Sequence, residues 1–107
     1  MLDKANLSGA DLRGARLMSK LDDVNLEGAN LSDLKAGADM RNQPMGLIRI
    51  VLTHASLKGA NLEGAKLGGA ILTDAQIHNA IFVGATGLKE VLGLDSTQGK
   101  ETATFDP

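Results

Sequence analysis

Alanine recurs at every fifth position of this 107-residue chain between residues 55 and 85. A leucine, isoleucine or phenylalanine lies two residues after each of the first six of these alanines. The repeated unit is therefore Ala-x-Leu-x-x, most plainly in residues 60–64, which read Ala-Asn-Leu-Glu-Gly. An internal repeat of fixed length constrains the fold more strongly than any other property of a sequence.

A five-residue period fits neither an ordinary helix nor an ordinary strand. On an α-helix, leucines five residues apart would rotate by about 140° per step and spread around the surface. On a flat strand they would alternate between the two faces. If each unit instead forms one side of a square coil, every leucine and alanine points to the axis. Glycines such as Gly59 and Gly64 then permit the corners. The sequence predicts an all-β solenoid.

The first half of the chain carries the same unit, at residues 5–9, 10–14 and 29–33. Near Leu17 the spacing shortens by one residue, because Leu21 follows after four. We interpret this slip as a shortened corner within a continuing repeat. Aromatic residues make up only 2% of the chain. A core of leucine and alanine indicates a narrow, regular interior.

These units resemble the pentapeptide-repeat family, whose consensus is Ala-(Asp/Asn)-Leu-x-x, and the resemblance covers most of residues 1–85. It implies a right-handed quadrilateral β-helix in which four units make one coil. Coils in such a fold stack at the normal strand spacing of about 4.8 Å. The resemblance therefore implies about four coils in this chain.

The repeat is interrupted between Arg41 and Leu52, and Pro44 cannot donate to an interior ladder. We expect an irregular loop at residues 41–46. One interpretation is a bulged coil with partly buried apolar residues. The other is a protruding loop that binds a partner, since loops on rigid scaffolds often carry function. Its candidate contact residues are Arg41, Asn42, Gln43, Pro44 and Met45.

After Ala85 the repeat stops and the pattern changes. Leu88, Val91, Leu92 and Leu94 form an apolar stripe, and Gly93 is a stop signal, which together predict a short capping helix over residues 86–95. Residues 96–107 are polar and lack the period, so we expect a flexible tail. Nothing comparable precedes Leu2, which leaves an end-to-end homodimer or a missing preceding segment as open alternatives.

The sequence offers little that favours catalysis. His54 and His78 lie 24 residues apart, which does not match a coil of about 20 residues, so they are not expected to stack. Asp23 and Asp33 fall at or beside corners, where aspartate commonly forms turns. We therefore expect no catalytic residues, no cofactor and no metal ligands.

Two functions from different classes remain. Members of the family that it resembles inhibit or protect DNA gyrase by mimicking DNA with acidic faces. Residues 1–85 carry nine acidic and nine basic side chains and are neutral, which disfavours that alternative and makes a nucleic-acid partner unexpected.

The favoured function is a non-catalytic structural or protein-binding module with an unidentified protein partner. Ile71, Ile81 and Val83 are outward apolar positions that either contact this partner or are covered by the C-terminal segment. No stretch resembles a signal peptide or a membrane helix, so a cytoplasmic location is the default expectation. The thylakoid lumen, where the family also occurs, stays open.

Overall fold

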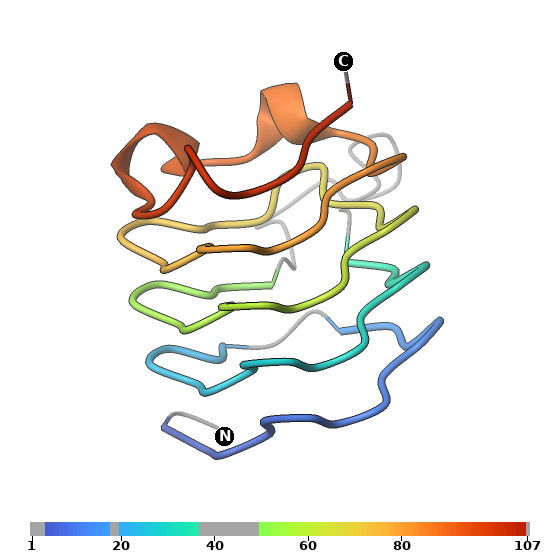
Figure 1. Cartoon of the computed structure of the whole chain (residues 1–107), viewed down its shortest axis with the longest axis vertical. Coiled ribbons are helices and arrows are strands. Elements are labelled where there is room, and N and C mark those ends of the chain that lie inside the picture. Colours follow the sequence, from blue (N-terminus) through green and yellow to red (C-terminus); the bar gives the residue numbers. More distant parts are fainter. Residues whose placement is uncertain (1–3, 18–19, 37–49, 107) are drawn as a thin grey trace, which may run out of the picture.

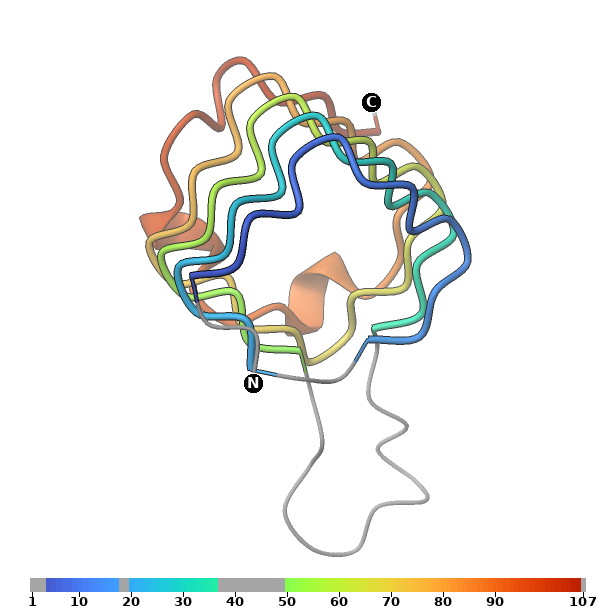
Figure 2. The same ribbon diagram turned by 90° about the horizontal axis from the view of Figure 1, so that it is seen from below.

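The chain winds into a stack of coils around a common axis (Figure 1). The structure is a computed structural model that describes residues 4–17, 20–36 and 50–106. Seen along the axis, each coil has four sides that lie over those of its neighbours (Figure 2). Each repeat unit contributes a single parallel bridge to the coils above and below it.

The bridges fall into four columns, and each column defines one side of the solenoid. The first side is marked by Asn6, Asn25, Ser56, Gln76 and Gln98, and the second by Asp11, Asn30, Asn61, Ile81 and Thr104. The third side is marked by Arg16, Lys35, Lys66 and Thr86, and the fourth by Lys20, Val51, Ile71 and Leu92. In the regular units these positions directly precede the central leucine, isoleucine or phenylalanine, which points inward, so their own side chains point outward.

Each unit combines a one-residue bridge with a tight turn. Leu26 N–H donates to the Ser56 carbonyl of the next coil over 2.8 Å, and Asn25 N–H donates to the Ala5 carbonyl of the preceding coil over 2.9 Å. The Ala29 N–H then closes the corner onto the Leu26 carbonyl. Such a turn needs a positive φ at its third residue. Gly28 supplies it with a φ of 67°.

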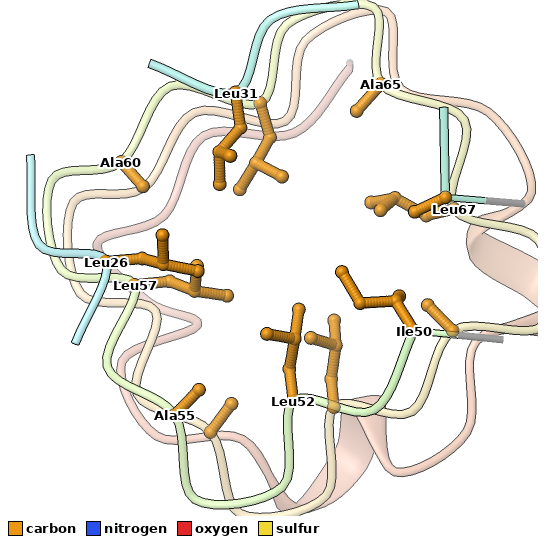
Figure 3. Close-up of a cluster of buried hydrophobic side chains, with 14 of the residues drawn as sticks. Leu26, Leu31, Ile50, Leu52, Ala55, Leu57, Ala60, Ala65 and Leu67 are labelled. Carbon is orange, nitrogen blue, oxygen red and sulfur yellow. The ribbon is translucent and has the colours of Figure 1, made fainter. Parts of the chain in front are cut away.

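The interior is a column of leucines flanked by alanines. Figure 3 shows Leu26 and Leu57 side by side, with Leu31, Leu52 and Leu67 entering from other sides. On the third side of the second coil the two inward positions are exchanged, because Leu34 takes the alanine position and Ala36 the leucine position. Both are completely buried. The exchange conserves volume, which a close-packed core tolerates.

One coil is much longer than the others. Nineteen residues separate Asn6 from the bridged Asn25, whereas thirty-one separate Lys20 from Val51. The extra residues come between Ala36 on the third side and Ile50 on the fourth. The predicted irregular loop at 41–46 and its contact residues Arg41, Asn42, Gln43, Pro44 and Met45 lie outside the described residues.

The segment 86–95 differs from the expected capping helix. It contains the single-turn 3-10 helix η1 (Leu88–Glu90), and a second such helix, η2 (Leu94–Ser96), begins at its end. Between them Leu92 stays in the ladder and donates its N–H to the Ala70 carbonyl over 2.8 Å. A continuous helix would withdraw that donor from the ladder. Gly87 and Gly93, both left-handed, set the start of each short helix.

The tail also differs from the expectation of a flexible segment. Gln98 bridges to Gln76, and Thr104 bridges to Ile81. The Phe105 ring stacks on Phe82 with the ring centroids 5.0 Å apart. Residues 97–105 therefore lie over the preceding coil and cover its core. At the opposite end, the leucines of the first coil, such as Leu7 and Leu12, are only partly buried.

Candidate interaction surfaces

The fourth side carries an apolar column on its outer surface. Val51, Ile71 and Leu92 follow one another through direct bridges. Val51 and Ile71 are half-buried, and Leu92 is 49% exposed. Outward positions of a solvated β-helix are usually polar, so three successive apolar side chains form a surface suited to contact. Lys20 begins the same column.

The candidate contacts Ile71, Ile81 and Val83 do not come together. Ile71 belongs to the fourth side, whereas Ile81 and Val83 belong to the second, on the other side of the coil. Val83 is 38% exposed, and Ile81 is bridged to Thr104 of the C-terminal segment. The C-terminal segment therefore runs beside Ile81. Among the described residues, Val51, Ile71 and Leu92 are the outward apolar residues that direct bridges join into one column, on the fourth side.

Val51 and Leu92 were absent from the predicted contact residues. The five-residue register places Val51 directly before a central leucine, which is an outward position. That signal was available in the sequence. Leu92 was hidden because its neighbours read as an amphipathic helix, and only the bridge to Ile71 shows that it continues a column.

The third side carries a basic column. Arg16, Lys35 and Lys66 are bridged in succession, and all three residues are exposed. The column continues to Thr86, which borders a shallow open depression of about 390 Å³. Gly87, Leu88, Lys89 and Glu90 complete its lining. The depression is an open hollow of the surface at the end of the third side, and it is not an enclosed pocket.

The first and second sides are dominated by local polar contacts. Asn6, Asn25, Asn30 and Asn61 each accept, through the side-chain oxygen, the N–H of the residue two positions on, at 2.9–3.1 Å. These bonds form Asx turns within one unit and stabilise its corner. On the second side, Arg13 donates to Asp11, and this hydrogen bond lowers the pKa of the Asp11 carboxyl.

The two histidines are separate, as their spacing predicts. His54 lies at a corner with a φ of 61°, and its Nε2 is 3.3 Å from Oδ2 of Asp74 in the next coil. His78 lies on the first side, where Gly99 packs closely against it. Within the described ranges, no three His, Cys, Asp or Glu side chains gather as they would around a metal ion. Asp23 and Asp33 adopt the left-handed corner conformation expected of turn formers.

No helix in the described part of the chain is long and apolar enough to cross a membrane.

The geometry defines a parallel β-helix built from five-residue units, with four chemically different sides. The pentapeptide-repeat family model matches residues 1–17 and 47–86 with eight copies of the repeat. The chain belongs to the pentapeptide-repeat family, whose members form right-handed quadrilateral β-helices. The resemblance inferred from the repeated units is confirmed.

Solved structures support the same fold. The chain is similar to the pentapeptide-repeat protein Rfr23 from the cyanobacterium Cyanothece 51142, with 31% identity and a TM-score of 0.80. That match covers 97% of this chain and 63% of the Rfr23 chain. The chain thus spans less than two thirds of that relative.

Two further solved structures match this chain with low TM-scores. HetL from Nostoc sp. strain PCC 7120, described as involved in heterocyst differentiation regulation, is 32% identical over 91% of this chain and 37% of its own, with a TM-score of 0.37. QnrB1, a plasmid-mediated fluoroquinolone resistance protein, is 12% identical over 81% of this chain and 52% of its own, with a TM-score of 0.32. Neither superposition supports an argument about function. No curated protein gave a significant sequence match.

Proposed function

We propose that this solenoid is a non-catalytic protein-binding module whose contact surface includes the fourth side. The observation that carries the proposal is the outward apolar column of the half-buried Val51 and Ile71 and the exposed Leu92. The coil interior is filled with leucine and alanine, so the described residues offer outer surfaces for recognition in place of an enclosed pocket. Apolar side chains held in line on a rigid ladder suit a complementary protein surface.

Charge reversal of this column should remove partner binding. A variant with Ile71→Lys and Leu92→Lys is expected to lose specific proteins that the wild-type chain captures from a lysate of the source organism, because desolvating a lysine at an apolar contact is unfavourable. The matched control is Ser56→Lys with Gln76→Lys, which adds the same charge to the first side at equivalent outward positions. Quantitative mass spectrometry of the bound fractions is the measurement.

The pattern of captured proteins decides the outcome. Proteins retained by the first-side variant and lost by the fourth-side variant support the proposal. Identical bound fractions for the two variants, or no protein enriched by the wild-type chain, would contradict it. Circular dichroism of each variant verifies that the solenoid remains folded.

The alternative function, a gyrase-interacting DNA mimic, receives no support from the charges. A DNA mimic needs acidic surfaces that compete for a DNA-binding saddle. The third side of this solenoid presents Arg16, Lys35 and Lys66 in line. We infer that the protein does not act on gyrase by DNA mimicry.

A gyrase supercoiling assay tests this inference directly. We expect the purified protein to leave the supercoiling rate unchanged, because its basic column repels the DNA-binding surface of an enzyme built to bind phosphates. An acidic pentapeptide-repeat protein of established inhibitory activity is the positive control. Inhibition by this chain at a low molar ratio to gyrase would overturn the inference.

A further inference from the structure

The three cationic side chains of the third side are brought together only by folding. Arg16 and Lys35 are 19 residues apart in the sequence, and Lys35 and Lys66 are 31 apart, yet each pair is directly bridged. Adjacent rungs of such a ladder are about 4.8 Å apart. The column therefore presents three positive charges at regular intervals along the solenoid axis.

Like charges directly opposite one another on neighbouring strands are destabilising. The other columns avoid this arrangement: the first side is uncharged at its bridged positions, and the corner before it sets His54 against Asp74. The ion pairs formed between described residues join Arg13 to Asp11, His54 to Asp74 and Lys100 to Asp95, and none involves the basic column. Although the repeats are neutral in total, their charge is unevenly distributed among the four sides, and the third side carries the positive column.

We propose that the basic column of Arg16, Lys35 and Lys66 docks an acidic α-helix of a protein partner, lying along the solenoid axis with one carboxylate opposite each rung. The proposal rests on the proposed function as a protein-binding module and names the chemistry of its partner. Repulsion within the column is relieved when carboxylates are placed opposite it.

The spacing of the column favours a helix over other acidic partners. Carboxylates on one stripe of an α-helix, at positions i, i+3 or i+4, and i+7, advance by about 5.4 Å per turn. This differs from the rung spacing of about 4.8 Å by an amount that flexible lysine and arginine side chains absorb. Carboxylates on one face of an extended strand advance by about 6.7 Å, and the mismatch grows by about 2 Å at each rung.

The neighbouring charges disfavour a wide polyanion. Asp33 lies at the corner between the second and third sides, with its carboxylate directed to Gly64 of the next coil. Glu63, also exposed, precedes that glycine. A DNA duplex spanning more than one side would meet these carboxylates. A single helix about 10 Å wide can lie on the basic column alone.

Synthetic peptides provide the test. The probe is an alanine-based helical peptide of about 20 residues with its glutamates on one stripe. The comparison peptide has the same composition with the glutamates dispersed around the helix. Binding to the full chain is measured by fluorescence anisotropy at about 50 mM and about 300 mM salt.

We expect the striped peptide to bind at least about tenfold more tightly than the dispersed one at low salt, and less tightly at high salt. Arg16→Gln with Lys35→Gln and Lys66→Gln should abolish that preference without lowering the unfolding midpoint, since it removes like-charge repulsion. The control Lys4→Gln, Lys58→Gln and Lys100→Gln removes the same charge from exposed residues outside the column and should retain the preference.

Equal binding of the two peptides would overturn the proposal, because it would show only nonspecific attraction. So would tighter binding of duplex DNA or anionic vesicles through the same three residues, which would assign the column to a nucleic acid or a membrane. The experiments distinguish failure of the fourth-side proposal from failure of the third-side proposal. If only the third-side prediction fails, the fourth-side variant still loses its captured proteins; if only the fourth-side prediction fails, the peptide preference remains.

Discussion

Gly87→Ala is expected to destabilise the solenoid far more than Gly84→Ala, although the two glycines are three residues apart and share a similar backbone conformation. Their φ angles are 79° and 73°. A left-handed conformation costs an alanine about 1–2 kcal/mol. We expect Gly84→Ala to lower the free energy of unfolding by about that amount.

The difference lies in the space around each Cα. A Cβ on Gly84 would meet its nearest neighbour, the Gly64 nitrogen, at 3.5 Å, which is ordinary contact. A Cβ on Gly87 would lie 2.6 Å from the Gly68 Cα in the coil below. Because the Gly68 Cα is a backbone atom and cannot rotate away as a flexible side chain can, the two coils must separate locally. Overpacking of this kind costs about 2 kcal/mol more.

Urea unfolding followed by far-ultraviolet circular dichroism measures both variants, and Gly84→Ala is the internal control. The Gly87 variant should unfold at the lower urea concentration of the two. Equal midpoints would show that the coils at the third side are not packed as closely as the structure places them.

The interior of this solenoid was predictable from the sequence because it depends on a local rule. Each five-residue unit places its own leucine and alanine inward, as at Leu57 and Ala55, wherever the unit occurs. Even the exchanged pair of Leu34 and Ala36 obeys the rule that inward positions are apolar. Local patterning decides such positions without knowledge of which coil lies above.

The outer columns were not predictable in the same way. The neighbour of an outward residue depends on the length of the whole coil, and coil length varies along this chain. Lys20 bridges to Val51 after 31 residues, and Val51 to Ile71 after 20. The basic column is therefore invisible in a charge count, which sums all four sides. A count of charges over residues 1–85 gives neutrality and misses the separation of charge between sides.

The tail escaped prediction for a related reason. The coils gain residues near the C-terminus, so Gln76 bridges to Gln98 after 22 residues and Ile81 to Thr104 after 23. The 3-10 helices η1 and η2 each accompany one extra residue at a corner, and a third extra residue lies between Gln98 and Thr104. The five-residue period is therefore lost after residue 85, although the coil continues. Phe105 nevertheless occupies the inward position above Phe82.

Phe82→Ala is expected to lower the free energy of unfolding by about 4 kcal/mol, because the Phe82 ring is completely buried and its removal leaves a cavity in a close-packed column. The loss should extend to the tail, since the Phe105 ring stacks on Phe82. The Thr104 N–H donates to the Ala80 carbonyl, and the Gln98 N–H to the Ala75 carbonyl. Both amides should exchange their hydrogen faster in the variant.

Phe82→Leu is the matched control, because leucine fills the equivalent inward position of the same side at Leu31 and Leu62. It should cost less than about 1.5 kcal/mol and preserve slow exchange at Thr104 and Gln98. Amide exchange measured by nuclear magnetic resonance separates local from global opening, since the Leu57 amide, bonded to the Gln76 carbonyl, reports on the inner coils. Fast exchange at Thr104 and Gln98 already in the wild-type chain would show that the tail does not cover the last core layer. The contribution of Phe82 to the free energy of unfolding would then come from contacts within its own coil and the coil before it.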